Sequence, residues 1–365
     1  MLEEIRVIDF SQYLPGPHAT LRLSDLGAEV IKVESPLGDP ARGSLDENGA
    51  GYVFLAQNRN KKSIVLNLKD TNDQEIALNL IAEADIVIES FRPGVMDRLG
   101  IGYENAIKVN SDIIYCSLTG YGQAGTISHL GGHDLNYMSL SGMLSQFKDR
   151  NGRPMQPSNT IADFVGGISA SESILAALVK RFKTGEGSYI DLSITDSLLS
   201  LMTNHVVIAN ETGEEHGIDR LNNKLVCYYL YETSDHRFVS LAALEPKFWN
   251  AFCKAVNKES WIKAHLSLAQ QDNPVFKEMT ALFASKTFAE WTQFSLEVDC
   301  CLAPVLEASE LSNHPLMKDR GLIANNADFQ YILTNYHALR TNNQPPPEFG
   351  QHTEQIITRF KGKVK

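Results

Sequence analysis

Residues 5–34 of the chain read IRVIDFSQYLPGPHATLRLSDLGAEVIKVE, and this stretch decides the fold. Its apolar runs at 5–10 and 28–34 predict two strands. Between them, residues 18–26 have the pattern of a helix that ends at Gly27. Two short buried strands joined by a helix are typical of a β-α-β unit, in which both strands lie parallel in one sheet.

The same alternation continues through the first half of the chain. We expect further strands at 85–90, 112–118 and 190–194, and helices at 72–83 and 164–182. This pattern predicts an α/β domain built on a parallel sheet.

The pattern changes after about residue 204. Residues 228–231 and 238–244 flank a polar turn, which predicts a hairpin, and three helices are expected at 248–256, 273–284 and 288–298. The predicted organisation is a large α/β domain over 1–204, a linker over 205–220, a small α+β domain over 221–320 and a C-terminal segment over 321–365 that returns to the large domain.

Composition argues against several classes of protein. The chain has 33 Lys and Arg against 44 Asp and Glu, a net charge of −11 that disfavours nucleic acid. Five cysteines without a C-x-x-C pair do not form a disulfide framework or a common zinc motif. No signal peptide and no uninterrupted apolar run of about 18 residues are evident. We therefore expect a cytoplasmic protein without a membrane or nucleic-acid partner.

A nicotinamide-dinucleotide site is the first alternative, because acidic Glu34 closes the second strand. Such a site needs G-x-G-x-x-G after the first strand. The turn here is LPGPH at 14–18, with one glycine and two prolines that lack N–H donors. This turn disfavours dinucleotide binding.

A metal site is the second alternative. His129 and His133 have the spacing of two ligands on one helix face. Gly131 and Gly132 lie between them and disfavour a regular helix, and the sequence offers no obvious third ligand. We therefore predict no metal site.

Three ionisable residues stand in places where sites form. His133 precedes a predicted helix that Asp134 would cap, with Leu135 facing the core. Asp163 opens the long helix, and Glu245 ends an apolar strand. Each position also has a purely structural explanation, as a loop residue or a helix start. Together, however, an imidazole and two carboxylates suit proton abstraction and return.

The small-residue run after Asp163 is a separate signal. Gly166, Gly167, Ser169, Ala170 and Ser171 are all small, and the glycines and serines among them lower helix propensity. Such residues allow close approach of another backbone or of a ligand. Capping by Asp163 does not explain this run.

Several blocks in this order resemble the class III CoA-transferase superfamily along nearly the whole chain. They are PGP at 15–17, DLGA at 25–28, NKKSIVLNLK at 60–69, FRPGVMDRLG at 91–100, TGYGQ at 119–123, residues 187–196, residues 301–306 and FGQHT at 349–353. Two segments, GHDLNY at 132–137 and ALEP at 243–246, are similar to those of the α-methylacyl-CoA racemases within this superfamily.

The resemblance implies roles for individual residues. His133, Asp163 and Glu245 match the catalytic positions, with Glu245 supporting His133. The positions matching the CoA-binding residues are Val65, Leu66, Asn67, Leu68, Arg92, Gly132, Asp134, Leu135, Asn136 and Tyr137. No metal or other cofactor is implied, because coenzyme A is part of the substrate.

One departure concerns CoA phosphate. The racemases usually have an arginine before the proline that follows the second strand, where this chain has Ser35 before Pro36. Substitute cations in the sequence are Lys32, Arg42, Lys61, Lys62 and Arg92. For Lys61 and Lys62, a solvated loop without ligand contact is the alternative.

The resemblance also implies a reaction. The expected activity is interconversion of (R)- and (S)-2-methylacyl-CoA, with His133 and Asp163 on opposite faces of the α-carbon. The N–H of Asp134 is the candidate donor to the enolate oxygen. Two alternatives stay open: a CoA-transferase with Asp163 as nucleophile, and a CoA-binding protein without catalysis. The family forms interlocked homodimers, which would let Glu245 act across the subunit interface.

The acyl tail needs an apolar wall. Met138, Met143 and Leu144 are candidates for it, although their helical spacing favours a place in the core.

Overall fold

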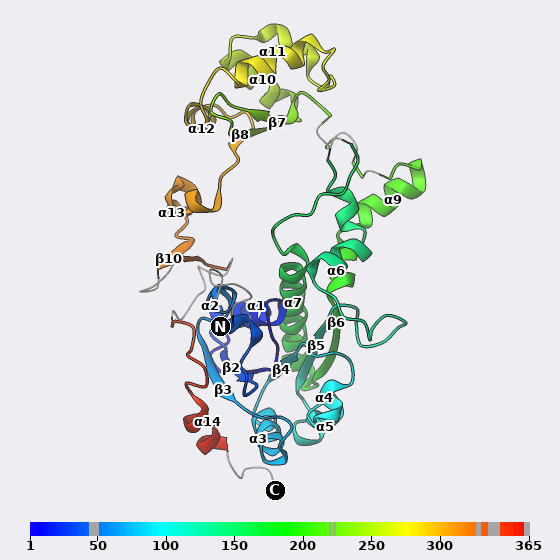
Figure 1. Cartoon of the computed structure of the whole chain (residues 1–365), viewed down its shortest axis with the longest axis vertical. Helices are drawn as coiled ribbons and strands as arrows, with labels where there is room; N and C mark the ends of the chain where they lie inside the picture. Colours follow the sequence, from blue (N-terminus) through cyan, green and yellow to red (C-terminus); the bar gives the residue numbers. More distant parts are fainter. Residues whose placement is uncertain are drawn as a thin grey trace. The chain divides into compact units, whose positions relative to one another are not determined.

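The computed structural model describes residues 1–43, 51–149, 151–215, 217–218, 221, 224–325, 330–334 and 344–360. The chain divides into two compact units. Unit 1 comprises Met1–Thr203 and Arg320–Lys365, and unit 2 comprises Asn204–Asp319. Figure 1 draws unit 1 in blue, cyan and dark green with a red C-terminal segment.

Unit 1 is built on a six-stranded sheet in which all neighbouring strands are parallel. The strand order is β3-β2-β1-β4-β5-β6. The strands are β1 (Arg6–Asp9), β2 (Glu29–Glu34), β3 (Lys61–Val65), β4 (Ile86–Glu89), β5 (Ile114–Thr119) and β6 (Ser188–Ser193). The chain thus builds outward from β1 and then returns to its other side, which confirms the expected α/β fold with a Rossmann-like sheet.

Helices cover both faces of this sheet (Figure 1). Val7 and Ile88 face a core shared with α1 and α7, whereas Ile8 and Val87 face a core shared with α3, α5 and α14. The helices of unit 1 are α1 (Pro15–Asp25), α2 (Tyr52–Gln57), α3 (Thr71–Ala82), α4 (Val95–Arg98), α5 (Tyr103–Val109), α6 (Asp134–Leu140), α7 (Ile161–Thr184), α8 (Ile194–Ser200) and α14 (Thr353–Phe360). Apolar residues on both sides of each strand are what a doubly covered parallel sheet requires.

Strand β3 was not predicted from the sequence. Its presence shows that the solvated-loop alternative is wrong for Lys61. Lys61 opens β3, and its Nζ donates to the Pro17 carbonyl at 2.9 Å and to Asn58 Oδ1 at 2.8 Å. The same Nζ lies 3.3 Å from Asp9 Oδ2, and both side chains are fully buried. Burial lowers the pKa of Lys61 to about 7, although Asp9 opposes this shift. Lys61 is therefore neither in a solvated loop nor available to a ligand.

The small residues of α7 serve contact with another backbone. A Cβ added at Gly167 would lie 2.6 Å from the Pro15 carbonyl oxygen and 3.1 Å from the His18 side chain. At Gly166 it would lie 2.8 Å from the side chain of Ile194. Gly167 therefore lets α7 cross α1 closely, and Gly166 lets α7 pack against Ile194 at the start of α8.

Helix α7 is also long and apolar enough to cross a membrane by length and composition alone, the one such helix among the described residues. Core helices pass the same test. Ala170, Ile174 and Leu178 of α7 are buried in the core cluster that includes β1, β4 and β5.

Unit 2 contains an antiparallel sheet of β7 (Tyr228–Glu232), β8 (Phe238–Ala242) and β9 (Leu302–Pro304). Its helices include α10 (Pro246–Ala255), α11 (Pro274–Phe283) and α12 (Phe288–Glu297), which follow the expected ranges closely. The short α13 (Pro315–Asp319) ends the unit. The core is aromatic, with Trp249, Phe252 and Trp291 fully buried.

Two segments differ from expectation. Helix α9 (Thr203–Thr212) occupies much of the expected linker; residues 216, 219 and 220 of that range lie outside the described residues. In the C-terminal segment, the hairpin β10 (Ile323–Asn325) and β11 (Gln330–Ile332) and the helix α14 were not expected. Ile356 and Phe360 of α14 are buried in the core beside β3, so this segment completes one face of unit 1.

Candidate active site

A cavity of about 620 Å³ lies at the carboxyl edge of the parallel sheet. Its walls include residues 12–15 after β1, 90–93 after β4 and 118–120 at the end of β5. Strands β1 and β4 are neighbours where the strand order reverses. Open α/β sheets bind ligands at this point, because the loops from the two strands diverge there.

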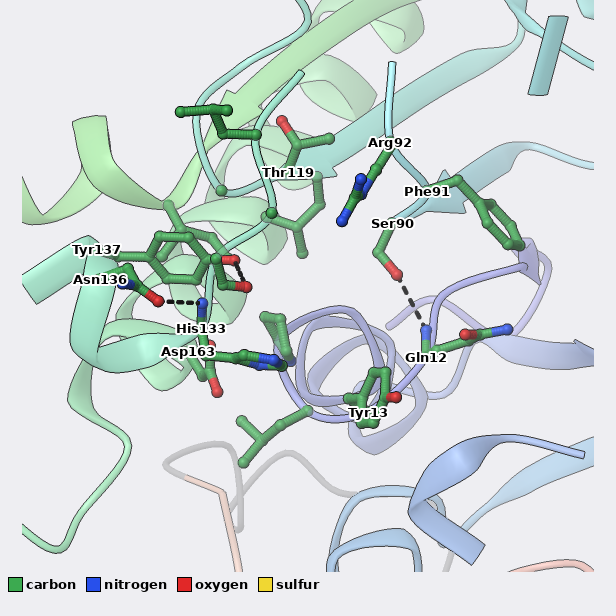
Figure 2. A pocket seen from close by; sticks show the side chains of 18 of the residues that line it. Gln12, Tyr13, Ser90, Phe91, Arg92, Thr119, His133, Asn136, Tyr137 and Asp163 are labelled. Atoms are coloured by element: carbon green, nitrogen blue, oxygen red, sulfur yellow. Dashed lines mark hydrogen bonds between the residues drawn. The ribbon is translucent and has the colours of Figure 1, made fainter. Parts of the chain in front are cut away.

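His133 lines this cavity from the start of α6. It is the residue before the helix, and its N–H donates to Asn136 Oδ1 at 3.0 Å. Its side chain is directed into the cavity (Figure 2). Two expectations are wrong here: Asp134 is the first residue of α6 and not its cap, and Leu135 is 37% exposed and not in the core.

Asp134 caps a different helix. Its Oδ1 accepts the N–H of Ala162 at 2.6 Å and of Asp163 at 3.1 Å, both in the first turn of α7. Because Asp134 lies directly after His133, this contact ties the start of α6 to the start of α7. It brings His133 and Asp163 to one site.

Asp163 lies in the first turn of α7 and lines the same cavity. Burial, followed by the negative charge of Asp134, raises the pKa of Asp163 to about 7. A carboxyl group with such a pKa exists in both protonation states at neutral pH. That property suits general acid–base chemistry, for which the best pKa is close to the working pH.

Tyr137 fixes the backbone before His133. A Cβ added at Gly132 would lie 2.7 Å from the Tyr137 ring, and one at Gly120 would lie 2.3 Å from it. The Tyr137 hydroxyl donates to the Gly132 carbonyl at 2.5 Å. Burial, with a smaller effect of Asp163, raises the pKa of Tyr137, so the phenol stays neutral. The close approach of the Tyr137 ring therefore requires glycine at both position 120 and position 132.

Of the five candidate phosphate-binding cations, four are paired within the protein. The pairs are Lys32 with Asp39, Arg42 with Glu34, Lys61 with Asp9, and Lys62 with Glu29. Arg92 is exposed and lines the cavity, and within the described ranges it forms no ion pair that would hold it elsewhere. Arg92 is therefore the cation best placed for an anionic ligand.

The predicted CoA-binding positions fall in two places. Arg92, Gly132, Asn136 and Tyr137 line the cavity, beside Asp134 and Leu135 at the start of α6. The other four are at and beyond the end of β3: Val65, Leu66, Asn67 and Leu68. Leu66 is 1% exposed and belongs to the core, whereas Asn67 is exposed. These four positions do not line the cavity that holds His133.

Glu245 lies in unit 2, where it directly precedes α10 and is exposed to solvent. His133 and Asp163 lie in unit 1. Within a single unit the structure therefore brings together two of the three predicted catalytic residues.

The candidate acyl-wall residues belong to the core. Met138 is fully buried, and Met143 and Leu144 pack partly buried against the same cluster.

Several residues that line the cavity were not part of the expected site, and three of them carry polar side chains in the loops after β1 and β4. Gln12, Tyr13 and Ser90 line it, and the Gln12 N–H donates to Ser90 Oγ at 3.0 Å, which joins the loop after β1 to the loop after β4 (Figure 2). Tyr13 has a positive φ of 63°, a backbone conformation that non-glycine residues seldom adopt. The available sequence signal was their place after predicted strands, at the edge where ligands bind.

Among the residues that the structure describes, no group of three or more His, Cys, Asp and Glu side chains is placed to hold a metal ion. His129 is exposed and does not line the cavity.

The turn between β1 and α1, considered above for dinucleotide binding, is tightly packed at Gly16. A Cβ at Gly16 would lie 2.2 Å from the Ser11 side chain.

The site thus combines an imidazole and a carboxyl group, each able to accept or donate a proton, with one exposed arginine at the wall. This set can abstract a proton from a weak carbon acid in an anionic ligand, or attack an activated acyl group through Asp163.

Comparison with known proteins identifies the family of the chain. The model of CoA-transferase family III matches residues 2–353, and the chain belongs to this enzyme family. It is 32% identical to human alpha-methylacyl-CoA racemase (98% of this chain, 93% of the relative) and 33% identical to mouse succinyl-CoA:glutarate CoA-transferase (98% and 85%). The crystal structure of a CAIB/BAIF family protein from Brucella suis has the same fold, with a TM-score of 0.86 at 23% identity over 99% of each chain.

Proposed function

We propose that the protein is a racemase that interconverts (R)- and (S)-2-methylacyl-CoA thioesters. The observation that carries the proposal is that His133 and Asp163, whose pKa is raised to about 7, line one cavity. The relatives include racemases and transferases at similar identity. The imidazole at residue 133 favours proton transfer, because a carboxylate nucleophile alone would serve the transferase reaction.

The reaction moves one proton. One group removes the α-hydrogen, and the electron pair of the C–H bond moves into the thioester carbonyl to give an enolate. The other group, already protonated, then delivers its proton to the opposite face of the α-carbon. His133 and Asp163 exchange roles when the other enantiomer is bound. Each such group is typically worth about 10²–10⁴-fold in rate.

The enolate oxygen and the CoA moiety need their own partners. The N–H groups at the start of α6, beginning with Asp134, are the proposed donors to the enolate oxygen. A preorganised donor of this kind is worth about 3–4 kcal/mol. Arg92 is the proposed partner of a CoA phosphate, because it is exposed at the cavity wall. The proton transfer requires no redox cofactor, since the substrate is neither oxidised nor reduced.

The test is deuterium incorporation. One enantiomer of a 2-methylacyl-CoA is incubated in D₂O, and α-deuterium and optical purity are followed together. We expect both incorporation and loss of optical purity, and a decrease of at least about 10²-fold in His133→Ala and in Asp163→Asn. Tight thioester binding without incorporation would instead indicate a CoA-binding protein without catalysis.

The second candidate is a CoA-transferase, favoured by the equally similar transferase relative and by the carboxyl group of Asp163 in the cavity. In that reaction Asp163 attacks the thioester carbonyl and the CoA thiolate leaves, which gives an acyl-aspartyl anhydride. The thiolate then attacks the aspartyl carbonyl, so that the first acid leaves as its carboxylate and an aspartyl-CoA thioester remains. The second carboxylate attacks this thioester to form a new anhydride, and the released CoA thiolate attacks its acyl carbonyl, which gives the second thioester and restores Asp163. It predicts that His133→Ala remains active and that a second carboxylic acid becomes a thioester stoichiometrically. CoA transfer without α-deuterium would establish this function.

A further inference from the structure

A second cavity in unit 1, of about 520 Å³, is made mostly of apolar side chains. Leu21 of α1, Leu55 of α2, Phe164 of α7 and Ile332 of β11 contribute to its walls. No Asp, Glu, Lys or Arg is among the described residues that line it. The first cavity, by contrast, contains Arg92 and Asp163. The second cavity therefore suits an uncharged, apolar ligand.

The one titratable imidazole in this cavity is neutral at physiological pH. His18 donates its Nδ1–H to Gln57 Oε1 at 2.9 Å, and its ring packs edge-on against Phe164 with centroids 4.9 Å apart. Burial lowers the pKa of His18 to about 4. His18 thus adds ring surface to the wall but no charge.

The two cavities adjoin along the chain. Asp163 lines the first and Phe164 the second, and Val53 lines the first and Tyr52 the second. Consecutive Cα atoms are about 3.8 Å apart, so α2 and α7 each present neighbouring residues to both cavities. Helices α2 and α7 therefore form part of the wall of both cavities.

Parts of the apolar wall are exposed to solvent. Tyr52 is 62% exposed and Ile332 is 52% exposed. Covering such surface with a hydrocarbon chain is favourable, at roughly 0.8 kcal/mol per buried methylene, or about fourfold in binding.

We propose that this second cavity, between α1, α2, α7 and β11, binds the alkyl chain of the acyl-CoA whose α-carbon lies between His133 and Asp163. The proposal rests on the thioester being the substrate and names long alkyl tails as the preferred class. It holds for a racemase and for a transferase alike, since both must hold the acyl group.

The experiment measures equilibrium binding and so does not depend on turnover. Calorimetry gives the Kd of 2-methyldecanoyl-CoA and of 2-methylbutanoyl-CoA, which differ by six methylenes. We expect the long thioester to bind at least about tenfold more tightly to the wild type. Two variants reduce this ratio by about tenfold: Ala56→Trp, which fills the cavity from α2, and Ile332→Lys, which places a charge in its wall. Ile332 is exposed, so the second variant does not disturb the core.

Ala176→Trp is the matched control, because Ala176 is exposed on α7 and lines neither cavity. We expect it to keep the wild-type ratio. A wild-type ratio near one, or a ratio that neither variant changes, would overturn the proposal, because the alkyl tail would then not bind in this cavity. Absence of deuterium exchange together with the expected ratios would overturn the racemase function while retaining the binding site.

Discussion

At the scale of the residue, the ionisation of Asp163 governs the expected pH dependence. A racemase site works when the pair of His133 and Asp163 holds one proton, so activity falls when the pair gains a second proton or loses the first. Since the pKa of Asp163 is raised to about 7, one limb of the profile falls near neutral pH. We expect bell-shaped kcat/KM profiles that superimpose for the two enantiomers, measured from about pH 5 to about pH 9.

The matched control is Asp134→Asn. The variant keeps an oxygen that accepts the N–H groups of Ala162 and Asp163, but it removes the negative charge that helps to raise the pKa of Asp163. The limb near pH 7 is expected to move to lower pH. A single rise to a plateau in the wild type would contradict the racemase assignment and match a carboxylate nucleophile.

The same raised pKa predicts a trade-off between stability and activity. The folded-state pKa of Asp163 lies above its ordinary value of 3.8, so the folded protein holds this proton more tightly, and stability decreases as pH rises from about 4 to about 7. Asp163→Asn removes that cost. We expect the free energy of unfolding at neutral pH to increase by about 1–2 kcal/mol, below the roughly 4 kcal/mol of the full shift because the site is partly solvated.

Urea titrations at about pH 7 and about pH 4 measure this effect. The gain of Asp163→Asn over the wild type should shrink at the lower pH, where the wild-type carboxyl group is protonated in both states. An equal gain at both pH values would refute an ionisation effect.

At the scale of the element, the crossing of α1 and α7 positions Asp163. Gly166→Ala and Gly167→Ala form a matched pair in one helix. Alanine favours a helix by about 1 kcal/mol over glycine, but at Gly167 its Cβ would meet the Pro15 carbonyl, whereas at Gly166 it would meet the movable side chain of Ile194. We expect Gly167→Ala to lose about 1–3 kcal/mol of unfolding free energy and Gly166→Ala to lose less.

Chemical denaturation of the two variants gives the comparison. If Gly167→Ala were as stable as Gly166→Ala, the close approach of α7 to Pro15 would not limit the packing. Deuterium incorporation by the folded Gly167→Ala protein should also fall, because α7 carries Asp163 and α1 follows the loop at the cavity.

At the scale of the whole molecule, Glu245 raises the question of which chain supplies it. Glu245 lies in unit 2 and His133 in unit 1. If the protein forms an interlocked homodimer, as its resemblance implies, Glu245 of one subunit supports His133 of the other. Mixing inactive His133→Ala chains with inactive Glu245→Ala chains then restores one intact site in each mixed dimer. A purified mixed dimer should therefore have about half of the activity of a wild-type dimer, and a random mixture about a quarter.

The measurement is deuterium incorporation after the two variants are co-expressed, with each variant alone as the control. A further control mixes wild type with the chain that carries both His133→Ala and Glu245→Ala. If Glu245 acts across the interface, these mixed dimers contain no intact site, so they show how much activity is residual and not restored. Absence of complementation in verified mixed dimers would place all catalytic groups within one subunit.

The sequence was sufficient for much of the framework. The alternation of apolar runs and helices from Ile5 onward predicts the parallel sheet, because strand and helix periods depend on local patterns. It predicts the hairpin of unit 2 for the same reason. Strand β3 and helix α14 were missed, since β3 opens with Lys61 and Lys62 and α14 gains its place through burial of Ile356 and Phe360.

Motifs in the sequence also named His133 and Asp163 as candidates, but tertiary structure decided what they share. Asp134 joins α6 to α7 through contacts across 28 and 29 residues of sequence, and burial beside it gives Asp163 its raised pKa. Lys61 is buried against Asp9 and so is excluded as a ligand, while Arg92 faces the cavity. Burial and charge proximity depend on residues far apart in the chain, so local patterns identify the chemical groups and the folded arrangement decides their environment.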